Sequence, residues 1–440
     1  MATKLPKDDA IIRLSLAKFS LTMETLTREY TVTEKEGKIM HVENIGWDNR
    51  LAERTKGMRS SVIRELLKLT MEPDIISFAG GLPAPEFFPI REFDEASQHV
   101  LRTQGKVALQ YSPTEGYQPL RIFLAEMMSK YGIHVEPDNI MMTNGSQQGL
   151  DLIGKLFVDR DDCVLCSRPT YLGALQAWNA YEASYCSVPL DDDGMLVDQV
   201  EKELKSGTKP AFVYVLPNFH NPAGTTLSEE RRQRLVELAR KYDLVLVEDD
   251  PYGELRYEGE YLTPIFRMAP ERTIYMSTFS KTLAPGIRLA WITAPKPLIA
   301  RLVQGKQGAD LHTGTFVQMI ANDICQRGIL RQHVRRLRDV YRSRRDAMLD
   351  AIAEHWPEEV KFTRPEGGLF LWPRLPEKID TKDFLETAVA EKVAYVPGFA
   401  FYPGEDGGRH AMRLNFSHAN EETINEGIHR MGVALKRALV

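Results

Sequence analysis

Residues 273–291 have the sequence TIYMSTFSKTLAPGIRLAW, and this stretch decides the fold class of the chain. It contains two short apolar runs, one before and one after a turn that is rich in hydroxyl side chains. Short apolar runs bounded by turn residues are typical of buried strands. Lys281, in the turn, therefore directly follows a buried strand.

Similar runs recur from about residue 115 to 295 and are separated by helical patterns or turns. The runs are NIMMT, AFVYVL, LVLVE, TIYMS and LAWIT. One intervening helix is marked by Ser228 as an N-cap, with Glu229 and Glu230 in its first turn. Strands that alternate with helices predict βαβ units and a mostly parallel sheet covered by helices, which is an α/β doubly wound fold.

The flanking segments predict further units. We expect an N-terminal extension or arm, a helix followed by the irregular loop FAGGLPAPEFFP, a large domain built on the sheet, and a smaller C-terminal α+β domain with the strands GGLFLWPRL and MRLNFS. The expected ranges are 1–56, 57–110, 111–330 and 331–440. The loop and the helix before it are expected to form part of the small domain or a lid.

The composition excludes several classes of protein. Of the 440 residues, 43% are hydrophobic and 27% are charged, which is typical of a globular chain and not of a disordered or collagenous one. The net charge of -5 gives no global positive field that would attract nucleic acid or an anionic membrane. No run of eighteen apolar residues and no secretory signal is seen, so we expect a cytoplasmic protein without a membrane partner.

The four cysteines are too few for a disulfide scaffold, which agrees with a reducing compartment. Cys163 and Cys166 form a CxxC within a strand-like run, where this spacing sends the two side chains to opposite faces. We therefore expect neither a redox pair nor a metal site there.

Eight arginines lie between residues 327 and 345. Asp339 and Asp346 interrupt the run, and no aromatic residues alternate with the arginines. The pattern favours a helix with a charged exposed face over a nucleic-acid site.

The segment NGSQQGLDLIG places a small-residue turn between a strand and a helix. The amides of Ser146 and Gln147 would then be free at the positive end of the helix, where they could hold a phosphate. A serine-capped helix without any function is the alternative.

Two further segments carry groups suited to chemistry. Glu248, Asp249 and Asp250 follow the strand LVLV at the carboxyl edge of the sheet, where they could serve solubility, bind a metal, or pair with a protonated ring nitrogen. Lys281 could form a Schiff base if its surroundings lower its pKa, or it could be a surface lysine.

Taken together, HNPAG, DDPY and TFSK followed by PGIRL resemble, in their order, the fold type I pyridoxal-phosphate aminotransferases of the class I/II group. The resemblance extends from about residue 58 to the end. The runs SVIRELLKLT, SFAGGLPAPEFFP and YSPTEGYQPLR are similar to the branch of 2-aminoadipate, aromatic and kynurenine aminotransferases, and to the aminotransferase-like domain of MocR-type regulators. This resemblance implies a seven-stranded-type sheet with a smaller domain, and pyridoxal 5'-phosphate as the cofactor.

The resemblance also implies roles for individual residues. Lys281 would bind the cofactor covalently and move the proton at the substrate α-carbon. Asp249 would pair with the ring nitrogen, Tyr252 and Asn221 would bind the phenolic oxygen, and Tyr171 would stack on the ring.

Six residues are implied as ligands of the cofactor phosphate. They are Ser146, Gln147, Thr278, Ser280, Arg288 and Tyr111. Tyr111 would come from the neighbouring subunit, which implies a homodimer with shared active sites. At Thr278 many relatives have serine, which keeps the hydroxyl.

Substrate contacts are implied for a further group. Arg413 would bind the substrate α-carboxylate, assisted by Asn221 and by the backbone near Gly80 and Gly81. Arg64, on the helix before the AGGLP loop, is a candidate for the distal carboxylate of acidic substrates, or an ordinary solvated arginine.

We therefore expect an aminotransferase that moves the amino group of an L-amino acid, 2-aminoadipate-like or aromatic, to 2-oxoglutarate by a ping-pong mechanism, without a metal. The alternatives are a pyridoxal-phosphate-dependent lyase or decarboxylase on the same fold, and a MocR-type regulator that lacks its DNA-binding domain.

Overall fold

The computed structural model describes residues 46–58, 74–405 and 407–439. The chain divides into two units, residues 1–52 and residues 53–440. In the first unit the described element is a 3₁₀-helix, Trp47–Asn49. All elements discussed below belong to the second unit.

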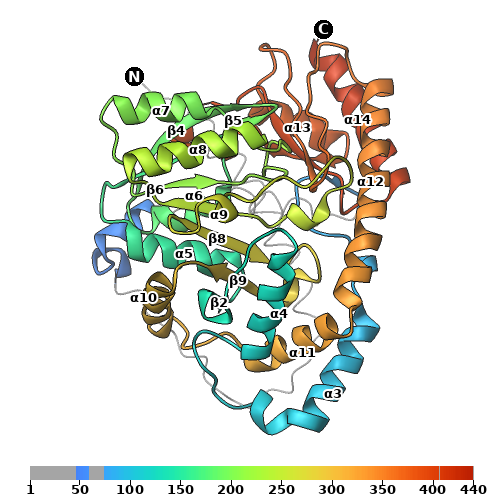
Figure 1. The fold of residues 1–440 in the computed structure, drawn as a ribbon. Coiled ribbons are helices and arrows are strands. Elements are labelled where there is room, and N and C mark those ends of the chain that lie inside the picture. Colours follow the sequence, from blue (N-terminus) through green and yellow to red (C-terminus); the bar gives the residue numbers. More distant parts are fainter. Residues whose placement is uncertain (1–45, 59–73, 406, 440) are drawn as a thin grey trace. The chain divides into compact units, whose positions relative to one another are not determined.

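An eight-stranded sheet forms the centre of the second unit (Figure 1). Its strand order is β2-β9-β8-β7-β6-β3-β4-β5. The strands are β2 Ile140–Thr143, β3 Cys163–Arg168, β4 Ser184–Asp191, β5 Gly194–Met195, β6 Phe212–Val215, β7 Leu246–Asp249, β8 Thr273–Thr278 and β9 Ala290–Thr293. The neighbouring strands β4, β3, β6, β7 and β8 pair in parallel. Strand β9 is antiparallel to both of its neighbours, β8 and β2.

The predicted α/β fold with a mostly parallel sheet is confirmed, and the five apolar runs named above are strands. The sheet contains one strand more than the seven-stranded type. The additional strand is β5, a two-residue strand that pairs antiparallel with the end of β4.

Helices cover both faces of the sheet because successive strand residues point to opposite sides. Val247 and Ile274 pack into one core, whereas Leu246 and Tyr275 pack into two cores on the other side. The helices are α3 Ile90–Ala108, α4 Gln118–Ser129, α5 Ser146–Phe157, α6 Leu172–Asn179, α7 Val197–Lys205, α8 Glu229–Tyr242, α9 Ile265–Met268, α10 Lys296–Gln307 and α11 Thr315–Gln326. Helix α8 begins as predicted, since the Ser228 side chain accepts a hydrogen bond from the backbone amide of Arg231 at 3.4 Å.

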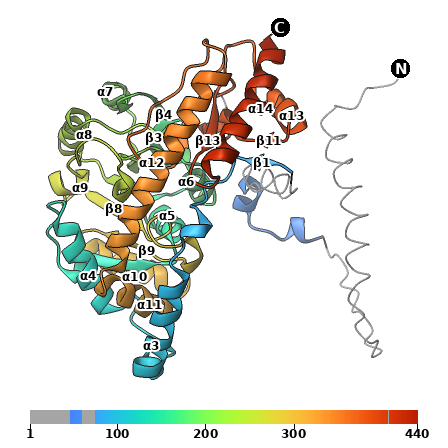
Figure 2. The same ribbon diagram turned by 90° about the vertical axis from the view of Figure 1, so that its right-hand side faces the viewer.

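A smaller sheet follows in the C-terminal part, with the order β10-β13-β12 and antiparallel pairing. These strands are β10 Phe370–Leu371, β12 Val396–Pro397 and β13 Met412–Asn415. The helices are α12 Ile329–His355, α13 Thr381–Ala390 and α14 Glu421–Leu439. Helix α12 contacts α11 at one end and α14 along its length, and it therefore connects the two sheets (Figure 2).

The segment before the AGGLP loop joins this smaller part. Strand β1, Ile76–Ser77, pairs in parallel with β11, Val393–Ala394. The expected helix around residues 61–70, and Arg64 with it, lie outside the described residues.

The arginine run lies mostly on helix α12, as predicted, but two of its arginines are not on the exposed face. Arg344 and Arg345 are buried, and they donate to the backbone oxygens of Ser417 at 2.6 Å and Pro365 at 2.8 Å. Glu86 and Glu258 pair with the two guanidinium groups. Loops that are distant in the sequence therefore cover helix α12 on this side, which the helical periodicity of the sequence does not reveal.

One disulfide joins Cys163 of β3 to Cys186 of β4, with the Cα atoms 6.1 Å apart. Cys166, the other half of the CxxC, is buried and free. One disulfide does not make a disulfide scaffold, in agreement with the sequence analysis. It gives no support, however, to the expected reducing compartment. No helix in the described ranges is both long and apolar enough to cross a membrane.

Candidate active site

The carboxyl ends of the parallel strands bring most of the predicted site residues to one edge of the sheet. Asp249 is the last residue of β7, and Thr278 is the last residue of β8. Ser146 is the first residue of α5, three residues after β2 ends at Thr143. Side chains that are distant in the sequence therefore meet at this edge.

Asp249 is 2% exposed and has one oxygen without a partner. Its Oδ2 accepts a hydrogen bond from Tyr214 Oη at 2.7 Å, while Oδ1 is buried and unpartnered. Burial raises the pKa of this carboxyl to about 7, against the lowering effect of Tyr214. A cationic donor at Oδ1 would restore the ionised form, and the protonated ring nitrogen of a pyridine is such a donor.

Lys281 lies in the turn after β8, and its Nζ donates to the backbone oxygen of Gly81 at 2.7 Å. Burial, followed by the charges of Arg413 and Arg288, lowers its pKa to about 8. About a tenth of the amine is then neutral at pH 7, far more than for a lysine with its ordinary pKa, and the neutral form is the nucleophile. Lys281 is therefore not the surface lysine of the alternative interpretation.

Arg413, on β13, connects three distant parts of the chain. Its Nη1 donates to Asn221 Oδ1 at 3.0 Å and its Nη2 to the backbone oxygen of Ala79 at 2.6 Å, while Nε has no partner. The guanidinium lies 4.4 Å from the ring centroid of Phe370. Burial lowers the pKa of Arg413 to about 10. A buried, fixed guanidinium with a free donor is suited to a carboxylate.

The two predicted tyrosines lie in the same cluster. Burial raises the pKa of both Tyr171 and Tyr252, and the charge of Asp249 contributes to both. A hydrogen bond from the Asn221 side chain offsets part of the effect at Tyr252. Both phenols thus remain protonated and can donate hydrogen bonds.

The start of α5 forms a cradle with Arg288. Ser146 Oγ is buried and without a partner. Gly145 precedes the helix with φ 74° and ψ 164°, and a Cβ atom there would overlap the guanidinium of Arg288. Backbone amides, a hydroxyl and a guanidinium at a helix N-terminus together suit a phosphate.

The other predicted phosphate ligands differ in what their side chains do. Gln147 Nε2 donates to the backbone oxygen of Gly173 at 2.8 Å, which leaves its backbone amide for a ligand. Thr278 Oγ1 lies 3.1 Å from the backbone oxygen of Leu289 and 2.9 Å from Ser280 Oγ. If Thr278 donates to that carbonyl, its only hydroxyl hydrogen is used, so Ser280 is the better donor of the pair.

A supporting cluster behind the cradle was missed by the sequence analysis. Lys306 is 0% exposed, and its Nζ donates to Gln148 Oε1 at 2.6 Å and to Asp310 at 2.9 Å. Gln148 Oε1 also accepts from the backbone amide of Asn144 at 2.8 Å. Nothing in the sequence links a lysine on α10 to this turn. Tyr214, by contrast, could have been found, because a tyrosine in a buried apolar strand needs a hydrogen-bond partner.

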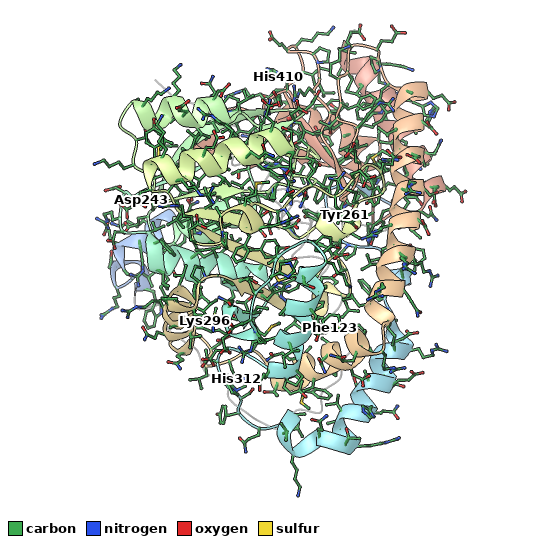
Figure 3. All side chains as sticks on the ribbon, viewed as in Figure 1. Phe123, Asp243, Tyr261, Lys296, His312 and His410 are labelled. Atoms are coloured by element: carbon green, nitrogen blue, oxygen red, sulfur yellow. A yellow bond between two sulfur atoms is a disulfide. The ribbon has the colours of Figure 1, made fainter. Side chains whose placement is uncertain are left out.

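Three other predicted residues are placed less directly. Gly80 is buried next to Gly81, so the backbone of this loop does face the site. Tyr111 is 79% exposed, and its ring meets that of His312 edge-on at 5.8 Å; His312 is labelled in Figure 3. Arg64 lies outside the described residues, and its role stays a prediction.

The residues present fit pyridoxal 5'-phosphate. The unpartnered Oδ1 of Asp249 suits the ring nitrogen, the unpartnered Oγ of Ser146 and the cradle at Gly145 suit the phosphate, and Lys281 is an amine with a lowered pKa. Within the described ranges, no group of three or more His, Cys, Asp or Glu side chains could hold a metal ion. The fold and the site together define a pyridoxal-phosphate-dependent enzyme.

Comparison with known proteins gives the family. The model of the family "Aminotransferase class I and II" matches residues 78–431, so the chain belongs to this family. An aromatic-amino-acid aminotransferase of Thermococcus litoralis is 48% identical over 406 residues, covering 91% of this chain and 97% of the relative. A 2-aminoadipate transaminase of Thermus thermophilus is 42% identical over 399 residues, covering 90% of this chain and 98% of the relative.

A solved structure agrees with these relatives. The kynurenine aminotransferase of Pyrococcus horikoshii, in complex with PMP, has a TM-score of 0.86 and 45% identity, and the match covers 90% of this chain and 99% of that one. The predicted family, fold class and cofactor are confirmed. The protein is a pyridoxal-phosphate-dependent aminotransferase, and it acts on amino acids as small-molecule substrates.

Gly145→Ala is expected to weaken cofactor binding by about tenfold or more, which is the effect of losing roughly one charge-assisted contact. The new Cβ would displace Arg288, and the backbone there adopts a conformation that is accessible essentially to glycine alone. Titration of cofactor-free protein by fluorescence measures the affinity.

Gly207→Ala is the matched control. Gly207 also has a positive φ, 101°, but a Cβ atom there would meet nothing within 4 Å. This variant should lose some stability and keep its cofactor affinity. Equal affinities in both variants would contradict the role of the Gly145–Arg288 cradle.

Proposed function

We propose that this enzyme transfers the amino group of an aromatic or 2-aminoadipate-like L-amino acid to 2-oxoglutarate. The buried guanidinium of Arg413, held by Asn221 and Ala79, carries the proposal because it restricts ligands to those with a carboxylate. The class of side chain is supported by the names of the relatives, which act on aromatic amino acids, 2-aminoadipate and kynurenine.

The residue roles follow from the geometry of the site. Pyridoxal phosphate supplies a sink for the electrons released at the substrate α-carbon. Lys281 Nζ, whose pKa is about 8, would take the proton from this carbon and return it on the same face. Asp249 would hold the ring nitrogen, and Tyr252 and Asn221 would hold the phenolic oxygen. Arg413 would orient the α-carboxylate so that the α-proton faces Lys281.

A donor panel with 2-oxoglutarate tests the substrate class. We expect kynurenine, phenylalanine, tyrosine and 2-aminoadipate to be the best donors, with glutamate formed in equal amount. Release of ammonia without glutamate would instead indicate a lyase. Aspartate as the preferred donor would contradict the proposed side-chain class.

Arg413→Gln is expected to raise the KM of every amino and oxo acid by about 10²-fold, because a buried charge-assisted pair with the α-carboxylate is lost. Steady-state kinetics with two donors measures this effect. Arg409→Gln is the control, since Arg409 is an exposed arginine shortly before β13 and pairs with Asp380. A KM that rises for one donor alone would show that Arg413 binds a side chain and not the shared carboxylate.

A homodimer with shared sites is part of the proposal, supported by the exposed ring of Tyr111. Light scattering should give twice the mass of one chain. Mixed dimers of a Lys281→Ala chain and a Tyr111→Ala chain should contain one site with both native residues. They should therefore regain transamination, which the Lys281→Ala dimer lacks, at the cofactor concentration of the wild type, which the Tyr111→Ala dimer should exceed. No recovery on mixing would contradict the sharing of residues between subunits.

A further inference from the structure

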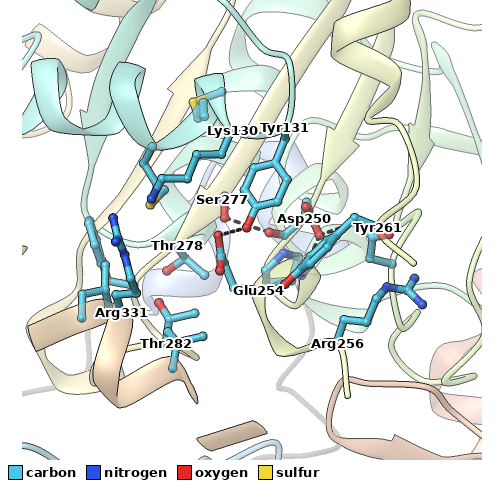
Figure 4. Close-up of a pocket in the computed structure, with 18 of the residues that line it drawn as sticks. Lys130, Tyr131, Asp250, Glu254, Arg256, Tyr261, Ser277, Thr278, Thr282 and Arg331 are labelled. Atoms are coloured by element: carbon cyan, nitrogen blue, oxygen red, sulfur yellow. Dashed lines mark hydrogen bonds between the residues drawn. The ribbon is translucent and has the colours of Figure 1, made fainter. Parts of the chain in front are cut away.

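A cavity of about 440 Å³ lies beside the strand ends, and none of Lys281, Asp249, Asn221 and Arg413 lines it (Figure 4). Of the phosphate ligands implied above, Thr278 lines it, and its hydroxyl lies within hydrogen-bond distance of the Leu289 backbone oxygen and of Ser280. It is enclosed by α4, the loop 250–264, the end of β8 and the first half of α12. Tyr275 and Ser277 point to this side of β8, whereas Met276 points to the opposite face. The cavity therefore lies on the face of the sheet opposite to the core that α5 covers.

One part of the cavity wall is apolar. The residues that provide it are Phe123, Met127, Ile133, Phe279, Leu330 and Val334. Phe123 and Tyr261, which come from two separate walls, are labelled in Figure 3. A wall of this size suits an aromatic ring or a short aliphatic chain.

Two donors in the wall make no hydrogen bond within the described part of the chain. Thr282 is 7% exposed, and its hydroxyl makes no hydrogen bond there. Trp291 is 4% exposed, and its Nε1 is also without a partner. Buried polar groups are normally hydrogen-bonded, so the unpartnered Nε1 of Trp291 indicates a polar group beside this wall. The Thr282 hydroxyl is open to the cavity and free to donate to a ligand.

The mouth of the cavity is cationic. Lys130, Arg331 and Arg335 line the cavity and are exposed, and among the described residues none of the three has an ion-pair partner. Helix α12 begins beside them at Ile329, with no acidic residue in its first turn and no side-chain cap. Its positive end therefore adds to the field of the three cations. Figure 4 shows Lys130, Arg331 and Thr282 on the same side of the pocket.

Two of the acidic side chains that line the cavity already accept hydrogen bonds. Glu254 accepts from Tyr131 and from Arg338, at 3.2 Å for Arg338 Nη2. Asp250 accepts from Asn218 at 2.9 Å and from the Gly253 amide at 2.9 Å. Glu126 lines the adjoining groove together with Arg331 and Arg335, and makes no ion pair in the described part of the chain. One carboxylate therefore faces three cations, and the mouth keeps a net positive charge.

We propose that this cavity is a second, non-catalytic binding site for a small monocarboxylate with an aromatic or aliphatic body. Arg331, Arg335 and Lys130 attract the carboxylate, the Thr282 hydroxyl donates to it, and the apolar wall covers the body of the ligand. Ser277 Oγ donates to the backbone oxygen of Asp250 at 2.8 Å, and both residues line the cavity. The ligand therefore contacts the segment that directly follows Asp249.

The test uses the holoenzyme and 4-phenylbutyrate, which has no amino or oxo group and cannot be transaminated. Isothermal titration is expected to show saturable binding of one molecule per cavity. Arg331→Gln should weaken this binding by about tenfold, as expected for one charge-assisted contact. Arg336→Gln, which removes a charge from the same helix at a residue that stacks on Phe87 and does not line the cavity, should leave it unchanged.

Two further variants separate the cavity from the catalytic site. Met127→Trp should abolish binding because the larger side chain fills the cavity, and transamination should continue. Arg413→Gln should leave 4-phenylbutyrate binding unchanged. Loss of binding in Arg413→Gln with full binding in Arg331→Gln would overturn the proposal, because the probe would then occupy the catalytic site. Absence of saturable binding to the wild-type holoenzyme would overturn it as well, whatever the donor panel shows.

Discussion

Lys281→Ala is expected to lower kcat by at least about 10³-fold while the protein still binds pyridoxal phosphate. The variant lacks the amine that forms the covalent link and moves the proton at the α-carbon. The phosphate cradle at Gly145 and the carboxylate of Asp249 remain, so affinity for the cofactor should persist. Single-turnover spectra with an amino donor measure the loss, and added methylamine should restore part of the rate.

The covalent link has its own test. Borohydride reduction of the wild-type holoenzyme, followed by peptide mapping, should place the label on Lys281. Lys296→Ala is the control, because Lys296 is an exposed lysine that pairs with Glu136. Label on another lysine would end this assignment.

The pH dependence of cofactor attachment follows from the lowered pKa of Lys281. The amine is protonated below a pKa of about 8 and neutral above it. The rate of attachment to cofactor-free protein should therefore rise with pH and level off above about 8. In Arg413→Gln the inflection should move upward, because one of the two cations that lower this pKa is gone.

Asp249→Asn is the second large effect, with an expected loss in kcat of about 10²–10³-fold. Asparagine keeps the size of the side chain but cannot carry the charge that keeps the ring nitrogen protonated. The electron sink is then weaker, although the fold is retained. Tyr214→Phe should cost much less, since it removes one hydrogen bond to Oδ2 and leaves the carboxylate in place.

A stability measurement gives a second readout for Asp249. The pKa of this carboxyl is about 7 in the folded protein without cofactor and 3.8 as its ordinary value, so the folded state binds more protons between these values. Its contribution should lower the stability of the cofactor-free protein as pH rises from about 4 to about 7. Asp249→Asn should remove this contribution.

Asp250→Asn is the matched control for Asp249→Asn. The Asp250 side chain accepts from Asn218 and from the Gly253 amide, so its loss should affect stability more than kcat. Wild-type turnover in Asp249→Asn, with a large loss in Asp250→Asn, would transfer the role to Asp250.

The sequence by itself determined the sheet and the residues at its carboxyl edge. Short apolar runs fix β6, β7 and β8, and the residues that directly follow such a run must lie at the strand end, as Asp249 and Lys281 do. The turn before α5 was recognisable for the same reason, because its features are local in the chain. The family resemblance added the roles of these residues.

The tertiary structure alone decided which groups meet and which stay unpartnered. Arg413 reaches Ala79 and Asn221 across 334 and 192 residues, and Lys306 reaches Gln148 across 158. The cavity behind β8 combines residues from α4 and α12, and the burial of Arg344 and Arg345 depends on loops that are distant in the sequence. Periodicity and turn chemistry act over a few neighbouring residues. The pKa shifts at Lys281 and Asp249 arise mainly from burial. Burial and the long-range contacts exist only after the distant segments have packed together.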